Sequence, residues 1–355
     1  MNIIIGISHP KHVYIFKYLY FKLKEANHSV LVLASNKEMT CELLDKFGIN
    51  YVLMGVNKKN LISKLLQVIK YFFITFFYAI KFKTDIFIGF GYIHFALVSF
   101  ILRKPFIFPD DTEVAKTLHK ILMPFTSAFL TTSGFKNKLS NKQIWFNGNL
   151  ELLYLHPKRF KTETFKKPNE KYVLLRFVSW NAFHDVGHHG LSFQAKKQLV
   201  NEVLKYAKVY IASENDLPDE FKKYQLKIPP EKIHEFVYGA ELVVGESPTM
   251  TTESAVLGTP AICISSWACN SLGNFSELYK DDMIYCYHPD EEKAAIQKAI
   301  QLLSTKDLKN IWRGKAEKFI NSRIDLAEFM VWFIENYPES HKIMKENPDY
   351  QNRFK

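Results

Sequence analysis

Several common signatures are missing from this chain of 355 residues, and each absence excludes a class of protein. Gly6 is the only glycine at the end of the first predicted strand and in the turn after it, so the glycine-rich loop of P-loop and dinucleotide-binding proteins is absent. The four cysteines show no C-x-x-C spacing, which excludes common zinc and redox motifs and predicts reduced thiols. No run reaches the roughly 18 apolar residues that span a bilayer. The chain begins with a predicted strand, Ile3–Ile7, so we expect no signal peptide and a cytoplasmic location.

Acidic residues are scarce in the first part of the chain. Residues 1–150 contain 19 Lys and Arg but only 8 Asp and Glu, whereas residues 151–355 contain 28 of each. The whole formal charge of +11 therefore lies in the first part, which predicts an anionic partner there. The lysines are scattered and no nucleic-acid motif is present, so we predict contact with an anionic membrane surface and none with nucleic acid.

Residues 61–83 have helical length, contain no Gly or Pro, and are rich in aromatic side chains. Two interpretations are open. The segment is a basic, aromatic helix that lies in a membrane interface, or a helix buried between the sheet and its neighbours. Under the first interpretation, the residues that contact the membrane or the acceptor are Lys70, Phe73, Phe76, Phe77 and Lys81.

Strand and helix patterns alternate along the chain, which is typical of doubly wound parallel α/β sheets. Residues 1–150 form a first series and residues 171–337 a second. Residues 151–170 are charged and lack sheet patterning, which predicts a linker, and residues 338–355 read as a polar surface tail. The sequence therefore predicts two Rossmann-like domains that face each other across a cleft, with ligands at the carboxyl ends of the strands.

The segment Leu242–Ile264 reads strand, turn, helix, turn, strand, with the turns at Gly245 and at Gly258 to Pro260. Ser247 or Thr249 can cap the helix, and Pro248 suits its first turn. The helix is expected to end at Gly258, where a left-handed residue is favourable. Its start would then combine hydroxyl groups with free backbone N–H groups, an arrangement that binds phosphate.

Glu253 lies about one turn into this helix, where its carboxylate can accept hydrogen bonds from a ribose diol. A diphosphate next to a sugar diol describes a nucleotide-sugar. The alternative is an ordinary βαβ connection with a hydroxyl-rich cap. The donor-binding candidates here are Ser247, Thr249, Met250, Thr251 and Glu253.

Two loops of the first part carry candidate bases. His9 and His12 follow the first strand and can act as a general base near neutral pH, or they belong to a capping turn. Asp111 and Glu113 follow a later strand and can act as a base. Alternatively, Asp110 or Asp111 forms a capping box with Glu113 at the start of the helix that we predict here from Glu113. Because Asp110 and Asp111 are not a D-x-D pair, no metal site is predicted.

Further donor-binding candidates lie in loops of the second part. Arg176 can hold a phosphate bidentately, and the histidines in the loop after it match no common zinc spacing. Two other loops lie where a nucleoside base would bind. Together these loops supply Arg176, Ser179, Trp180, Ser213, Glu214 and His234.

This ordered set of motifs resembles an uncharacterised family of GT-B-like proteins, catalogued as a domain of unknown function and usually described as glycosyltransferases. The resemblance extends to about residue 305. The wider superfamily also contains nucleotide-sugar glycosyltransferases and the non-hydrolysing UDP-GlcNAc 2-epimerases. The motifs that carry the resemblance are His9-Pro10 with His12-Val13, Asp111-Thr112-Glu113, Arg176 to Trp180, Ser213-Glu214 with Leu217-Pro218, and Thr249-Met250 with Glu253 and Leu257 to Pro260.

The resemblance implies GT-B architecture, with the donor nucleotide on the C-terminal domain, Glu253 on its ribose, and the acceptor on the N-terminal domain. We therefore predict a metal-independent glycosyltransferase without a cofactor, which moves a sugar from a nucleotide-diphosphate donor, UDP-sugars first, to a lipid-linked glycan in surface polysaccharide biosynthesis. The predicted location is the inner face of the cytoplasmic membrane, as a peripheral protein.

Two alternative functions stay open. The first is a nucleotide-sugar 2-epimerase or hydrolase that uses Asp111 and Glu113 as acid and base. The epimerases carry a His-x-Glu-Ala-Gly-Leu-Arg segment where this chain continues from Glu113 with Val, Ala and Lys, so an acid is kept but the Gly and Arg are lost. The second is a non-catalytic nucleotide-sugar or lipid-binding partner of another transferase.

Overall fold

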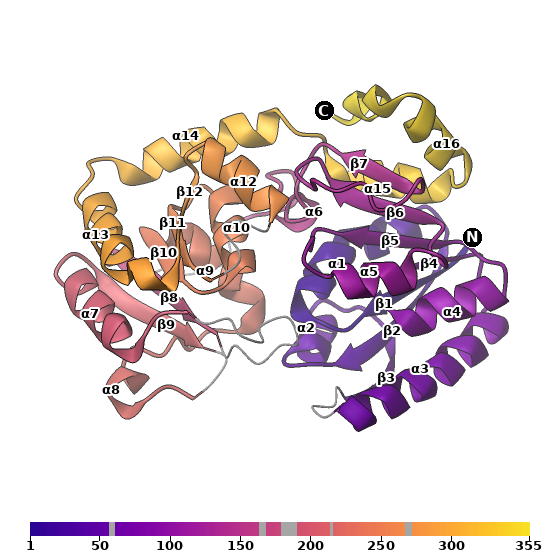
Figure 1. The fold of residues 1–355 in the computed structure, drawn as a ribbon, viewed down its shortest axis with the longest axis horizontal. Coiled ribbons are helices and arrows are strands. Elements are labelled where there is room, and N and C mark those ends of the chain that lie inside the picture. Colours follow the sequence, from indigo (N-terminus) through magenta and orange to yellow (C-terminus); the bar gives the residue numbers. More distant parts are fainter. Residues whose placement is uncertain (57–60, 163–167, 179–189, 214–215, 267–271) are drawn as a thin grey trace. The chain divides into compact units, whose positions relative to one another are not determined.

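The computed structural model describes residues 1–56, 61–162, 168–178, 190–213, 216–266 and 272–355 (Figure 1). These residues form two compact units. Unit 1 comprises Met1–Tyr154 together with Ile324–Lys355, and unit 2 comprises Leu155–Arg323.

Unit 1 is built on a parallel seven-stranded sheet. Ile3, Ile4 and Ile5, in a strand inside the sheet, are fully buried, as expected for a parallel strand that is covered on both faces. The strand order is β3 (Tyr51–Val56), β2 (Ser29–Asn36), β1 (Asn2–Ile7), β4 (Ile86–Ile88), β5 (Phe106–Asp110), β6 (Ala128–Thr132) and β7 (Gln143–Phe146).

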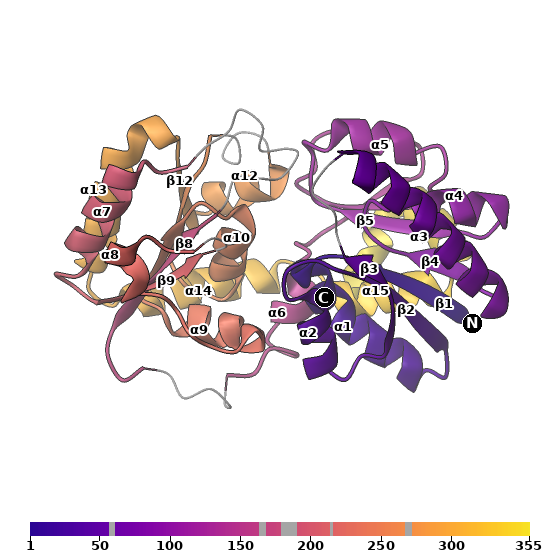
Figure 2. The same cartoon turned by 90° about the horizontal axis from the view of Figure 1, so that it is seen from below.

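Helices cover both faces of this sheet. Figure 2 shows α1 (Pro10–Glu25) and α2 (Thr40–Lys46) on one face, with α3 (Leu61–Lys81), α4 (Ile93–Ile101) and α5 (Lys116–Leu122) on the other. The second face is packed with aromatic rings. The rings with almost no exposed surface are those of Phe87, Phe95, Phe106, Phe108 and Phe129.

The C-terminal residues belong to unit 1. α15 (Leu326–Glu335) packs beside α1, and its Phe329 ring lies 6.5 Å from that of Phe146 in β7. The chain continues with α16 (Glu339–Glu346) and η4 (Pro348–Phe354). The sequence predicted that the second domain extends to residue 337 and that residues 338–355 form a surface tail. In the structure, residues 324–355 all belong to unit 1. The apolar face of a helix does not specify which of two sheets will bury it.

Unit 2 contains a parallel five-stranded sheet. Its order is β12 (Ile284–Tyr287), β11 (Ala261–Ile264), β10 (Leu242–Gly245), β8 (Tyr172–Phe177) and β9 (Lys208–Ser213). The prediction of an α/β fold with two Rossmann-like sheets is confirmed.

Helices also cover both faces of the second sheet, as Figure 1 shows. α7 (Phe193–Val203) packs against α13 (Glu292–Leu303), and α10 (Pro248–Val256) packs against α9 (Ile233–Gly239), α12 (Gly273–Lys280) and α14 (Leu308–Asn321). Shorter elements are α6 (Leu152–Leu155), α8 (Asp219–Lys222), η2 (Pro230–Lys232) and η3 (Pro289–Glu291).

Two predictions drawn from composition can be compared with this structure. Cys41 and Cys263 are free thiols, but Cys286 is disulfide-bonded, so the prediction of reduced thiols was wrong for Cys286. Within the ranges given above, no helix combines the length and the apolar character that crossing a membrane requires.

We expect unit 1 to be sensitive to mild acid because of His94 in α4. The side chain is 5% exposed, and its Nε2 has no hydrogen-bond partner among the described residues. Burial lowers the pKa of His94 from 6.5 to about 3. A depressed histidine pKa contributes stability that is fully present above about pH 6.5 and is lost as the pH falls toward 3. At pH 5 the expected loss is about 2 kcal/mol.

Urea unfolding at pH 7.5 and pH 5.0 measures this effect. The His94→Phe variant keeps an aromatic ring beside Tyr71 and Phe95, whose rings lie 5.5 and 5.2 Å from that of His94. The wild-type chain should lose about 2 kcal/mol more than the variant between the two pH values. Equal losses would show that His94 does not stay neutral in the folded chain.

Candidate functional site

The sheet of unit 1 changes its winding direction between β1 and β4, which are neighbours in the sheet. The loops after these strands are where open α/β folds bind ligands. His9 is the N-cap of α1, and its Nδ1 accepts a hydrogen bond from the backbone N–H of Lys11 at 3.1 Å. His9 is therefore better described as the cap of α1 than as a general base.

His12 lies one turn further, in a polar and aromatic setting. Its ring stacks on Phe90 with centroids 4.4 Å apart, and its Nδ1 lies 3.0 Å from the Tyr92 hydroxyl. That hydroxyl donates a hydrogen bond to Ser8 Oγ at 2.8 Å. Burial and, after it, the neighbouring charges of His9 and Lys11 lower the pKa of His12 well below its usual range. His12 is therefore a neutral imidazole at neutral pH, held in one orientation.

A charged cluster next to His12 joins three distant parts of unit 1. The ammonium group of Lys11 lies 2.9 Å from Asp111 Oδ2 and 3.0 Å from Glu151 Oε1. The Glu151 side chain is fully buried, and that of Asp111 is 9% exposed. Burial raises the pKa of Glu151, against the opposing effect of Lys11. Of the two carboxylates in this cluster, Asp111 is thus the one that keeps some exposed surface.

Neither Lys11 nor Glu151 was identified from the sequence. Lys11 stands between the two candidate histidines, which was the one local signal for it. Glu151 fell in the predicted linker, and nothing in the spacing indicates that it meets Lys11.

The acids around Asp111 have structural roles. Asp110 Oδ1 accepts hydrogen bonds from the backbone N–H groups of Asp111 and Thr112, and Asp110 Oδ2 lies 2.6 Å from Nε2 of buried His119. Glu113 is buried and accepts a hydrogen bond from the backbone N–H of Lys136. The predicted capping box does not form, because α5 begins at Lys116. Of the two predicted acids, only Asp111 belongs to the charged cluster.

In unit 2 the winding direction changes between β8 and β10, and α10 begins directly after β10. Ser247 is the N-cap, its Oγ accepting from the backbone N–H of Met250 at 3.3 Å, and Pro248 follows at the first helical position. The helix ends before Gly258, which has φ +69°. These predictions from sequence are confirmed.

The sequence predicted that threonine hydroxyls surround the start of α10, but two of them bond to the backbone of their own helix. Thr251 Oγ1 donates to the carbonyl of Ser247 at 2.9 Å, and Thr252 Oγ1 donates to that of Pro248 at 3.2 Å. Both side chains are buried, as is Met250. A threonine inside a helix can satisfy its hydroxyl on the preceding turn, and this happens here.

Glu253 is positioned by a histidine from another helix. His234 Nε2 in α9 lies 3.0 Å from Glu253 Oε1, and the two residues are 5% and 6% exposed. Both were predicted as donor-binding residues from separate loops, and the structure brings them together. The pairing fixes the direction in which the carboxylate points.

Glu246, the residue before the N-cap of α10, forms hydrogen bonds with the backbone of two other segments and so holds them next to the end of β10. It is 1% exposed and accepts hydrogen bonds from the backbone N–H groups of Val178 and Leu191, each at 2.9 Å. Lys196 forms an ion pair with it at 2.9 Å. A Cβ on Gly245 would lie 2.3 Å from the carbonyl oxygen of Arg176, so only glycine permits this strand pair.

The remaining candidates fall into two groups. Arg176 lies opposite Gly245 in the sheet, and Ser213 ends β9. Thr249 lies in the first turn of α10. Ser179, Trp180 and Glu214 lie outside the described residues. Among the described residues, no group of three or more His, Cys, Asp or Glu side chains could hold a metal ion.

A cavity of about 270 Å³ also lies in unit 2, at the opposite end of α10 from Ser247. It is lined by Leu257 at the end of that helix and by Tyr238, Arg313 and Phe160 among others. The Arg313 guanidinium stacks 3.2 Å from the centroid of the Tyr238 ring. This cavity is separate from the Glu253 site.

The model of one protein family, described as a protein of unknown function, DUF354, matches residues 1–326. The chain belongs to the DUF354 family. The resemblance inferred from the ordered motifs is thereby confirmed. No curated protein matches the DUF354 chain in sequence.

Solved structures share the fold over nearly the whole DUF354 chain. A UDP-GlcNAc 2-epimerase from Neisseria meningitidis bound to UDP-GlcNAc is 12% identical, with coverage of 95% of this chain and 100% of that chain and a TM-score of 0.68. Spinosyn rhamnosyltransferase SpnG complexed with thymidine diphosphate is 13% identical, with coverage of 95% and 100% and a TM-score of 0.60. The Streptomyces glycosyltransferase SsfS6 is 14% identical, with the same coverage and a TM-score of 0.58. At these identities the likeness shows the GT-B fold alone.

Proposed function

We propose that this DUF354 protein is a glycosyltransferase that moves a sugar from a nucleoside-diphosphate donor to a lipid-linked glycan acceptor. The observation that carries the proposal is the first part of α10, which lies at the switch point of the unit 2 sheet. Ser247 caps this helix, and Glu253, which pairs with His234, lies between one and two helical turns further along. The proposed setting is surface polysaccharide biosynthesis at the inner face of the cytoplasmic membrane.

The donor diphosphate would bind at the N-terminus of α10. Backbone N–H groups there carry the positive end of the helix dipole, which favours phosphate. Glu253 would accept hydrogen bonds from the ribose hydroxyls, with His234 holding the carboxylate in place. As the bond to the sugar breaks, the same N–H groups and Arg176 would stabilise the leaving diphosphate, so the transfer is proposed to proceed without a metal ion.

The acceptor hydroxyl would be deprotonated in unit 1. Asp111 is the best candidate for the base, because its side chain keeps some exposed surface whereas that of Glu151 is fully buried. Neutral His12 is the second candidate, because a neutral imidazole can accept a proton.

A nucleotide-sugar 2-epimerase or hydrolase is the alternative function. The observation that favours it is the carboxylate pair, Asp111 and Glu151, on a single lysine, an arrangement in which one acid can carry a proton while the other is ionised. Turnover of a nucleotide-sugar without an acceptor would support this alternative. Binding without any turnover would instead indicate a non-catalytic partner of another transferase.

Thermal unfolding in the presence of nucleoside diphosphates and their sugars tests the donor proposal. A ligand at about 100 times its Kd stabilises the folded chain by about 2.7 kcal/mol, which gives a clear rise in Tm. We expect such a rise for one nucleotide class, with UDP tested first. The absence of a rise with every uridine, guanosine, adenosine and thymidine diphosphate would contradict the proposal.

A further inference from the structure

The helix α3 has one buried face and one exposed apolar face. Tyr71, Thr75 and Ala79 are buried and follow one another at a spacing of four residues, which places them on one side of the helix. On the other side, Leu65, Phe73 and Phe77 are 65%, 63% and 58% exposed. Single exposed apolar residues are common, but an exposed row of them along a helix indicates a binding surface.

The exposed face is a continuous stripe along the helix. Its apolar members are spaced by three or four residues and span about 120° of the helix circumference at 100° per residue. Lys70 and Lys81 lie along one edge of the stripe, and Lys81 Nζ lies 5.9 Å from the centroid of the Phe77 ring. The apolar members of the stripe are Leu65, Leu66, Ile69, Phe73, Phe77 and Ile80.

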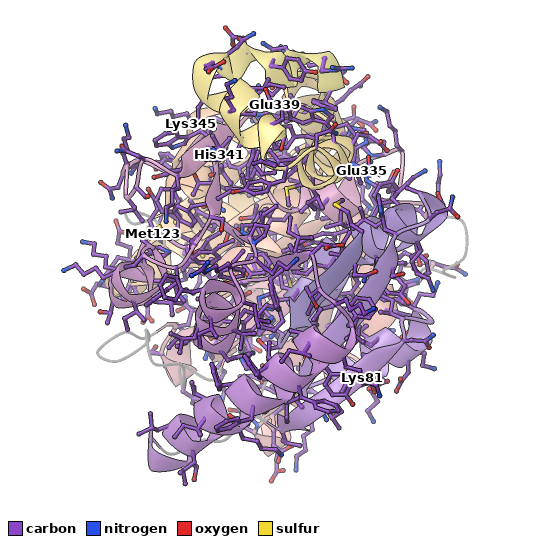
Figure 3. The ribbon with its side chains drawn as sticks, turned by 90° about the vertical axis from the view of Figure 1, so that its right-hand side faces the viewer. Lys81, Met123, Glu335, Glu339, His341 and Lys345 are labelled. Atoms are coloured by element: carbon purple, nitrogen blue, oxygen red, sulfur yellow. The ribbon has the colours of Figure 1, made fainter. Side chains whose placement is uncertain are left out.

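The neighbouring helix extends this surface. α4 packs beside α3, and both helices end at the amino edge of the parallel sheet. Phe100 and Ile101, the last residues of α4, are 61% and 53% exposed. Figure 3 shows α3 running across unit 1, with Lys81 labelled near its end. Phe76, which the sequence placed among the contact residues, is instead partly buried against the core, and its ring centroid lies 6.0 Å from that of Phe72.

The charge around the stripe is almost entirely positive. Between Asp45 and Asp110 the chain contains a single acidic residue, Asp85. That carboxylate accepts a hydrogen bond from the backbone N–H of Asn2 and lies 3.7 Å from Lys104. An anionic surface therefore meets lysines and a single, paired carboxylate in this part of the chain, whereas a symmetric contact with a second copy would set the same lysines against each other.

We propose that α3 and the end of α4 form the surface by which this protein lies on an anionic lipid bilayer. An exposed stripe about 24 Å long, apolar in the middle and basic at its edge, matches a helix that lies in the plane of the membrane interface. The phenyl rings would enter the acyl boundary, and the lysines would contact lipid phosphates. α3 begins at the carboxyl edge of the unit 1 sheet, the edge that carries His12 and Asp111. This inference rests on the proposed function only for the idea that the acceptor is lipid-linked and therefore lies in the same bilayer.

Cosedimentation of the full chain with vesicles tests this surface. The wild-type chain should bind vesicles of phosphatidylcholine with about one third phosphatidylglycerol, and binding should fall at least tenfold on pure phosphatidylcholine or in high salt. The Phe73→Ser/Phe77→Ser double variant should bind the anionic vesicles at least tenfold more weakly. The matched control is Phe193→Ser/Tyr279→Ser, which removes two aromatic rings of unit 2 that are 52% and 55% exposed and should leave binding unchanged.

Equal vesicle binding by the wild-type chain and the Phe73→Ser/Phe77→Ser variant would overturn the proposal, as would a lack of binding by the wild-type chain. A concentration-dependent dimer that the same double variant abolishes would assign the face to a second copy instead. The thermal rise with nucleoside diphosphate should persist in this variant, because α3 lies in unit 1 and the donor site in unit 2. Failure of lipid binding and failure of donor binding are therefore distinguishable.

Discussion

The Asp111→Asn variant is expected to transfer sugar about 1,000-fold more slowly than the wild-type chain while binding the donor with unchanged affinity. Asparagine keeps the shape of the side chain but cannot take a proton from the acceptor hydroxyl. The fold should survive, because Lys11 keeps its ion pair with Glu151 at 3.0 Å. Steady-state turnover with a lipid-linked acceptor, compared with donor Kd from thermal shifts, separates the two quantities.

Two control variants show which group acts as the base. Glu151→Gln removes the fully buried carboxylate of the same cluster and should lower turnover by less than Asp111→Asn does, because Glu151 acts only through Lys11. His12→Phe retains the stack on Phe90, and should keep most of the turnover if Asp111 is the base. An active Asp111→Asn variant together with an inactive His12→Phe variant would transfer the role of base to His12.

The fold was predictable to the extent that it depends on local patterns. β8 and β11 begin and end where the sequence predicts, because parallel strands covered on both faces read as short apolar runs bounded by turn residues. The start of α5 was predicted three residues too early, at Glu113 rather than Lys116. The Asp110 carboxylate there satisfies the backbone of the following residues, which extends the turn and delays the helix.

The candidate site was likewise predictable only where it depends on local patterns. The Ser247 cap and the left-handed Gly258 depend on neighbouring residues alone, and both follow from the sequence. The contacts of Lys11 with Glu151 and of His234 with Glu253 depend on which elements the topology brings together, so spacing along the chain does not reveal them. The direction of the Thr251 hydroxyl was also missed, because a helical threonine can turn toward solvent or back onto its own helix.

The Glu253→Gln variant is expected to bind its nucleoside diphosphate about 10- to 100-fold more weakly, with little loss of folding stability. A hydrogen bond to a charged group contributes about 1.5–3 kcal/mol, which corresponds to this range of affinity. The amide oxygen of glutamine can still accept a hydrogen bond from His234, so the contact that joins α9 to α10 is retained. The matched control is Glu235→Gln. Glu235 is also a buried glutamate but lies in α9, where it pairs with Lys232 at 2.8 Å, and its substitution should not affect binding.

The 2′-deoxy form of the same nucleotide distinguishes ribose recognition from a general weakening of α10. In the wild-type chain, removal of the 2′-hydroxyl should reduce affinity severalfold or more. In Glu253→Gln this preference should largely vanish, because the carboxylate that reads the hydroxyl is gone. The coupling free energy between Glu253→Gln and removal of the 2′-hydroxyl measures the contact between the carboxylate and that hydroxyl. If the variant weakened both nucleotides by the same factor and kept the preference, then Glu253 would support the helix without touching the ribose, and the ribose contact would have to come from another residue.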